Sequence, residues 1–150
     1  MNSEIAIVIQ TLNDIQSVED EADLDMLNQA VSQLANRSDK EEGIDVLLSL
    51  FERFPEKDGY GIFWSILSLL ETIPNYEAKL VESVQRQPAL FSLLMINRLL
   101  NTEIEVVNGE SLLNLLKGLA SNPTFSIPIR KAAQGFIEHQ EKRQADNLLL

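Results

Sequence analysis

The sequence predicts an all-α fold of about eight helices, stacked as antiparallel hairpins into a short α-solenoid or a compact helical bundle. Apolar residues recur with the helical period almost from end to end, and no stretch alternates convincingly as a strand. Helix pairs are expected after Ser38, Asn75 and Gly109, and the 37- and 34-residue spacings are typical of stacked helical hairpins. With 150 residues, 45% of them apolar, the chain fits a single domain, 1–150, that buries a core.

The first half of the chain predicts four helices. Their expected spans are 3–16, 21–37, 41–54 and a fourth that starts near Tyr60 and stops before Pro74. In the second span one arc of the helix is apolar and consists of Leu24, Leu27, Ala30, Val31, Leu34 and Ala35. The segment "SDKE", beginning at Ser38, has the spacing of a capping box before the third helix.

The second half predicts four more helices. Asn75 can cap a fifth over 76–87, and Pro88 occupies the favoured first position of a sixth. The connection 101–109 is expected to hold a little extended structure. Helices over 110–120 and 127–142 follow, and residues 144–150 are either a frayed tail or a docking contact.

The charge is strongly uneven along the chain. Residues 1–75 hold 15 Asp and Glu against 4 Lys and Arg, a net charge of −11, whereas residues 76–150 hold 8 of each kind. The first half repels nucleic acids and anionic membranes, so neither is expected as a partner, and it attracts a basic protein. The alternative is an acidic surface that only aids solubility.

The residue types that carry most catalysis and metal binding are scarce. Cysteine is absent, and the single histidine, His139, has no nucleophile or base beside it and no metal-ligand spacing. We therefore expect no enzyme activity, no metal and no cofactor. The N-terminus lacks the basic start of a signal peptide, and the longest apolar runs fall short of a membrane span of about 20 residues. A cytoplasmic protein is expected.

The fourth helix has two unlike faces. One is aliphatic and aromatic, while the other carries Tyr60, Trp64 and Glu71 among small and polar residues, namely Gly61, Ser65, Ser68 and Thr72. Either the small residues let a neighbouring helix approach closely, or the aromatic residues face a groove and anchor a partner.

The sixth helix is apolar on nearly every side, except for a polar group that includes Asn97 and Asn101, one turn apart. A polar pair on a buried helix costs free energy unless it is hydrogen-bonded. The pair is expected either to bond loop carbonyls or a Glu of a neighbouring helix, or to line the same groove as Trp64.

Two resemblances sharpen these expectations. The segment "IPIRKAAQGF" resembles the second helix of a HEAT-type repeat, so the stack is expected to be HEAT-like. More widely, residues 41–138 resemble the all-α immunity proteins of bacterial polymorphic-toxin and contact-dependent growth inhibition systems. The features that carry this resemblance are the Trp after a glycine turn in "YGIFW", the "ESVQRQP" hinge, "MINRLLN" and "NPTFSIPIRKAAQGF".

The resemblance implies a small cytoplasmic protein that binds and blocks the toxic C-terminal domain of an effector. Such toxins are commonly nucleases with a basic cleft, which the acidic first half would complement. No set of functional residues is carried over from the family. The alternative is a HEAT-like scaffold or adaptor that binds a host protein or peptide. A third possibility is an acidic nucleic-acid mimic, whose binding would collapse between low and moderate salt.

We therefore predict a partner-binding surface with two kinds of residue. Tyr60, Trp64 and Glu71 are expected to anchor the partner, because large amphipathic side chains dominate protein interfaces. Five acidic residues are expected to steer it electrostatically: Asp20, Glu21, Asp25, Glu56 and Asp58.

Overall fold

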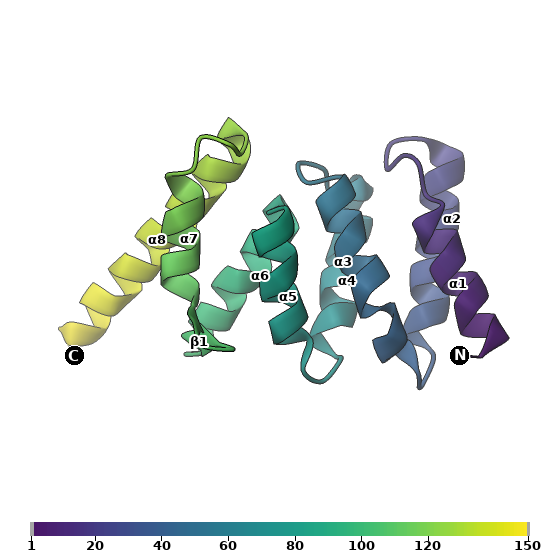
Figure 1. The fold of residues 1–150 in the computed structure, drawn as a ribbon, viewed down its shortest axis with the longest axis horizontal. Helices are drawn as coiled ribbons and strands as arrows, with labels where there is room; N and C mark the ends of the chain where they lie inside the picture. Colours follow the sequence, from purple (N-terminus) through teal and green to yellow (C-terminus); the bar gives the residue numbers. More distant parts are fainter. Residues whose placement is uncertain (1, 150) are drawn as a thin grey trace.

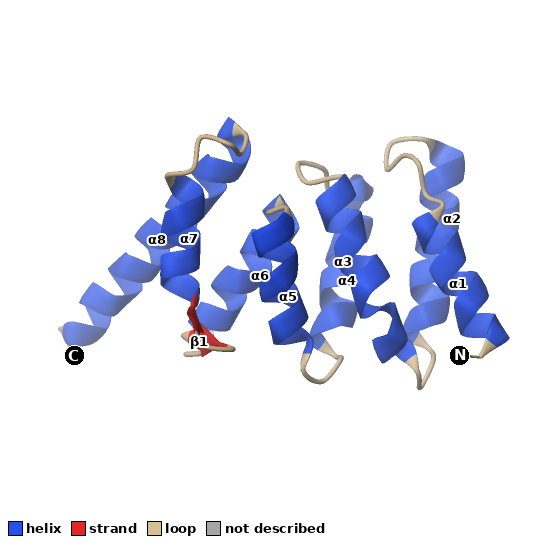
Figure 2. Ribbon diagram, in the orientation of Figure 1, coloured by secondary structure: helices blue, strands red, loops and turns tan. Residues whose placement is uncertain are grey.

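The computed structural model describes residues 2–149 and confirms the all-α prediction. Within this part of the chain there are eight α-helices, two 3₁₀ turns and one short β-hairpin (Figures 1 and 2). In chain order the elements are α1 (Ser3–Asn13), α2 (Glu21–Ala35), η1 (Lys40–Gly43), α3 (Ile44–Arg53), η2 (Gly59–Gly61), α4 (Ile62–Glu71), α5 (Tyr76–Arg86), α6 (Leu90–Asn101), β1 (Val106–Val107), β2 (Glu110–Ser111), α7 (Leu112–Ala120) and α8 (Ile127–Leu148).

The helices form four antiparallel hairpins that stand side by side in a row (Figure 1). Odd-numbered helices make one layer and even-numbered helices the other, with contacts along each layer from α1 to α3 to α5 and from α2 through α4 and α6 to α8. The loops within the hairpins all lie along one edge, at the top of Figure 1, which we call the loop edge. The connections between hairpins lie along the opposite edge, with both ends of the chain.

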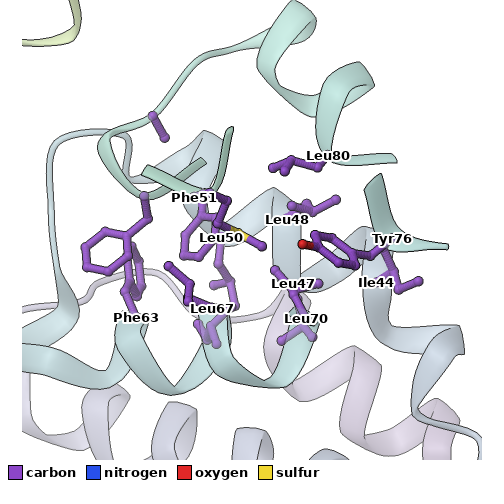
Figure 3. Close-up of a cluster of buried hydrophobic side chains, with 14 of the residues drawn as sticks. Ile44, Leu47, Leu48, Leu50, Phe51, Phe63, Leu67, Leu70, Tyr76 and Leu80 are labelled. Carbon is purple, nitrogen blue, oxygen red and sulfur yellow. The ribbon is translucent and has the colours of Figure 1, made fainter. Parts of the chain in front are cut away.

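An aromatic cluster occupies the centre of the apolar core between the layers. Phe51 of α3 meets Phe63 of α4 edge to face, with ring centroids 5.2 Å apart (Figure 3). Phe91 of α6 lies 5.7 Å from each of them. Phe51 and Phe63 are fully buried. Since these residues come from three helices, the cluster fixes the second and third hairpins against each other.

The predicted capping box before the third helix is wrong. Ser38 makes no cap, because the 3₁₀ turn η1 intervenes and α3 begins only at Ile44 after Gly43. Here α2 approaches closely: a Cβ at residue 43 would lie 2.5 Å from a methyl group of Leu34, so a larger residue would require Leu34 to shift. The chain therefore passes Leu34 at a glycine and enters α3 through the tighter turn.

Two other helix starts also differ from the prediction. The sixth helix begins at Leu90 rather than at Pro88, with Ala89 as its N-cap. The Leu90 amide donates to the Pro55 carbonyl at 2.8 Å, which ties the α5–α6 loop to the α3–α4 loop. Asn75 does precede α5, but in a left-handed conformation (φ +66°), and its side chain makes no capping hydrogen bond.

The polar pair on α6 is satisfied by α8. Gln140, only 2% exposed, donates to the Oδ1 atoms of Asn97 at 2.7 Å and Asn101 at 2.8 Å. Arg143 donates in turn to Gln140 Oε1 at 2.9 Å. The pair therefore bonds a neighbouring helix, through Gln140 rather than the expected Glu, and does not line a groove with Trp64. Because these bonds join α6 to α8, they fix the last hairpin in its place.

The last helix is longer than predicted, because α8 continues to Leu148. Residues 144–148 are thus helical, and His139 lies in the middle of the helix rather than near its end. The connection 101–109 contains the expected extended structure: β1 pairs with β2 across a turn in which Asn108 and Gly109 have positive φ. No helix within residues 2–149 has the length and apolar character needed to cross a membrane.

Candidate protein-binding surface

The turn before α4 holds an aromatic side chain out from the loop edge. Gly59, Tyr60 and Gly61 all have positive φ, of +57°, +50° and +92°. The Asp58 side chain accepts a hydrogen bond from the Tyr60 amide at 3.0 Å, and the Asp58 carbonyl accepts from the Gly61 amide at 3.1 Å. Tyr60 therefore lies outside α4, and its side chain is 75% exposed.

Two glycines make this turn possible, but Tyr60 between them is strained. A bulky residue rarely adopts the left-handed conformation, and such residues cluster at functional sites because the surrounding structure must enforce them. Here the enforcement comes from the glycine on either side and from Asp58. The sequence pattern "GYG" indicated only a turn, and it did not show that the tyrosine itself is left-handed.

Trp64 lies one turn further along α4 and is 51% exposed. Its ring meets Phe91 edge to face, with centroids 5.2 Å apart. Phe91 belongs to the aromatic cluster of the core, so Trp64 is supported from below by buried rings. An exposed aromatic residue on such a support loses little conformational freedom when a partner covers it.

A hollow of about 400 Å³ opens at the loop edge beside Tyr60. We call it the edge hollow, and it receives residues from the first three hairpins: Val18, Glu19, Glu56, Lys57, Asp58, Gly59, Tyr60, Leu90 and Phe91. Lys57 forms an ion pair with Glu19 across the first two hairpin loops. This hydrogen-bonded carboxylate raises the pKa of Lys57.

The five predicted steering residues are all exposed, and none of them forms an ion pair within residues 2–149. Asp20 and Glu21 open α2 at the loop edge, and Asp25 follows one turn later. Glu56 and Asp58 line the edge hollow. Some other acidic residues of the first half are compensated, as in the pairs of Asp45 with Lys79, Glu52 with Arg86 and Glu71 with Arg98, whereas the five steering residues are not. Negative charge therefore remains uncompensated at the loop edge.

Glu71 does not belong to this surface. It ends α4 about 10 Å along the helix axis from Trp64 and makes two 2.8 Å hydrogen bonds to Arg98. The same end of α4 lies beside Tyr76, whose pKa rises to about 12 because it is buried and lies near Glu71 and Glu77. The structure thus joins Tyr60 and Trp64 at one edge and places Glu71 toward the other.

The small residues on α4 do not serve the close approach of a neighbouring helix. Ser65, Ser68 and Thr72 are exposed, and together with Trp64 and Lys40 they line an open groove against the end of α2. That part of the prediction is wrong. Trp64 stands between this groove and Phe91, which lines the edge hollow, so the two depressions adjoin.

Sequence reasoning identified only Glu56, Asp58 and Tyr60 among the nine residues that line the edge hollow. Phe91 reads as core because it lies in the apolar run "ALFSLLMI", and it is indeed only 8% exposed. Glu19 and Lys57 are 38 residues apart, and no local pattern reveals their ion pair. Within residues 2–149 no cluster of three His, Cys, Asp or Glu side chains could hold a metal ion.

Comparisons of the chain with models of protein families, with curated proteins and with solved structures gave no match. The resemblance to immunity proteins therefore rests on the sequence features described above, and it stays a prediction.

The strained turn gives a stability prediction with a matched control. Gly61→Ala should lower the free energy of unfolding by about 1–2 kcal/mol, because alanine is strained at φ +92° although its Cβ meets no atom. Gly118→Ala, inside α7 and also free of contacts, should raise it by about 0.5–1 kcal/mol. Urea unfolding measures both. Equal effects of the two changes would contradict the assigned conformation.

Proposed function

We propose that this protein is an immunity protein that binds a cognate toxin domain stoichiometrically and neutralises it. The observation that carries the proposal is the loop edge, where two exposed aromatic side chains stand among carboxylates that lack ion-pair partners. Aromatic residues at the centre of an interface supply most of its binding energy, and unpaired charges around them steer a partner of opposite charge.

The charge favours a basic partner. A nuclease holds the phosphate backbone of its substrate in a cleft rich in Lys and Arg, and a surface with uncompensated carboxylates complements such a cleft. The proposed toxin is therefore a nuclease domain with a basic cleft. The sequence resemblance to all-α immunity proteins independently suggests the same kind of partner.

The loop edge is also well held, which supports tight binding. The Leu90–Pro55 hydrogen bond ties the third hairpin loop to the second, and the Glu19–Lys57 ion pair ties the second to the first. Asp23 accepts hydrogen bonds at 2.9 Å from the amides of Gln16 and Ser17 in the first loop. A surface ordered before binding loses less conformational entropy when the complex forms.

The groove beside Trp64 supports a second candidate, a HEAT-like scaffold or adaptor that binds a host protein or peptide. The two functions predict different genetics, since an immunity protein is encoded beside a toxin gene. A nucleic-acid mimic would bind mainly through charge, so its affinity would collapse between low and moderate salt, whereas an interface anchored by aromatic residues loses less.

The deciding experiment expresses the C-terminal domain encoded by the neighbouring effector gene in a laboratory bacterium, with and without this protein. Under the proposal the domain alone arrests growth, co-expression restores it, and the two proteins purify as a one-to-one complex. Growth arrest that persists on co-expression, with no complex, would overturn the proposal. If this protein, used as bait in lysate of its source strain, pulled down only housekeeping proteins, that result would favour the scaffold.

The aromatic residues should govern how long the complex lasts. Tyr60→Ala and Trp64→Ala should each raise the off-rate about 30-fold, corresponding to about 2 kcal/mol, with little change in on-rate. Surface plasmon resonance against the toxin domain measures both rates. Trp64 packs on Phe91, so its variant needs a melting-temperature control, whereas the exposed side chain of Tyr60 has no such structural role.

Glu71→Gln is the matched control for these two variants, because Glu71 lies on α4 with Trp64 but away from the loop edge. We expect unchanged rates for this variant. If Tyr60→Ala and Trp64→Ala bound the toxin as the parent does, the assignment of the surface would be wrong even if growth rescue succeeded.

The acidic residues should govern how fast the complex forms. Neutralising Asp20, Glu21, Asp25, Glu56 and Asp58 to their amides should lower the on-rate about 10-fold or more at low salt and flatten its salt dependence. The control neutralises five acidic residues that form no ion pair in the described part of the chain either but lie in its second half: Glu77, Glu82, Glu105, Glu138 and Asp146. Both variants change the net charge equally. An equal loss of on-rate would show that only net charge matters.

A further inference from the structure

The edge hollow combines apolar walls with an anionic rim. Val18 and Phe91 are nearly buried and Leu90 is half-buried, so the depth of the hollow is apolar. Tyr60 lines it with an exposed aromatic side chain. The charged residues around it are Glu19, Glu56 and Asp58, with a single cation, Lys57. Three carboxylates against one ammonium group leave the rim with a net negative charge.

Lys57 neutralises only one side of the rim. Its ammonium group pairs with Glu19, whereas Glu56 and Asp58 have no ion pair within residues 2–149. Asp58 Oδ1 accepts a hydrogen bond from the Tyr60 amide at 3.0 Å, and an ionised carboxylate has further acceptor sites. In the free protein Lys57 is therefore the cation at this rim, and the carboxylates of Glu56 and Asp58 would attract a second one.

These features match one type of side chain best. Arginine has an apolar stem that suits apolar walls, a flat guanidinium group that stacks on a tyrosine ring, and a fork of donors for two carboxylates. Lysine offers a more strongly hydrated point charge without a planar face. Acidic side chains are repelled, and purely apolar ones leave the carboxylates unpaired and desolvated.

We propose that the edge hollow receives one arginine side chain of the partner protein, between Tyr60 and the carboxylates of Glu56 and Asp58, and that Lys57 competes with this arginine for the rim. The identity of the partner as a basic toxin rests on the proposed function. The binding preference of the hollow does not, because it follows from the residues that line it.

The test uses small probes and needs no toxin. N-acetyl-arginine methylamide and its neutral analogue, N-acetyl-citrulline methylamide, are titrated into the ¹⁵N-labelled protein, and the amide signals of Gly59, Tyr60 and Gly61 are followed by NMR. We expect saturable shifts at these amides with the arginine probe and binding at least about 5-fold weaker with citrulline. The lysine analogue should bind with intermediate strength.

Matched variants separate the hollow from general charge attraction. Glu56→Gln with Asp58→Asn should weaken arginine binding about 5-fold or more, whereas Glu138→Gln with Asp146→Asn, an equal change in charge on α8 and away from the hollow, should leave it nearly unchanged. Lys57→Gln should strengthen binding about 3-fold, and Lys40→Gln, in the neighbouring groove, should not.

Several outcomes would overturn the inference. These are the absence of saturable shifts up to about 0.1 M probe, equal binding of arginine and citrulline, and equal effects of the two acidic double variants. Failure of the toxin experiment together with selective arginine binding would leave the hollow intact and refute only the immunity function. A toxin complex whose affinity is unchanged by Glu56→Gln with Asp58→Asn would keep the function and refute the arginine contact.

Discussion

The packing of Phe51, Phe63 and Phe91 is the contact on which the rest of the structure depends. The three rings come from α3, α4 and α6, and they join the second and third hairpins at the middle of the stack. The same cluster supports Trp64 through Phe91 and provides the wall of the edge hollow. The core and the proposed binding surface are therefore one assembly, in which a change to Phe91 alters both.

The uneven charge of the sequence is partly resolved across the hairpin boundaries. Cations of the third hairpin pair with carboxylates of the second, as Lys79 does with Asp45 and Arg86 with Glu52. The Glu52 side chain is mostly buried and also accepts a 2.7 Å hydrogen bond from Ser83. The Glu52–Arg86 pair is therefore more constrained than the Asp45–Lys79 pair. At the loop edge Glu19 pairs with Lys57, whereas Asp20, Glu21, Asp25, Glu56 and Asp58 have no ion pair within residues 2–149. Charge thus has a structural use between hairpins and is left free where the proposed partner binds.

Two kinds of restraint order the loop edge, one on backbone conformation and one on the positions of the loops. Backbone strain at Tyr60 is held by Asp58 and the flanking glycines, and loop positions are held by the Leu90–Pro55 bond and the Glu19–Lys57 pair. Such ordering reduces the entropic cost of binding.

The sequence by itself determined the helices and their pairing, because apolar periodicity and turn residues act locally and every hairpin needs a neighbour to cover its apolar face. It also predicted Tyr60, Trp64 and five acidic residues as parts of a partner-binding surface, and that assignment stays a prediction. Only the tertiary structure decided where α3 and α6 begin, because the packing of Gly43 against Leu34 and the Leu90–Pro55 bond are contacts between elements. It likewise decided that Glu71 is paired with Arg98 while Asp58 has no ion pair within residues 2–149, since ion pairs form between residues far apart in the chain.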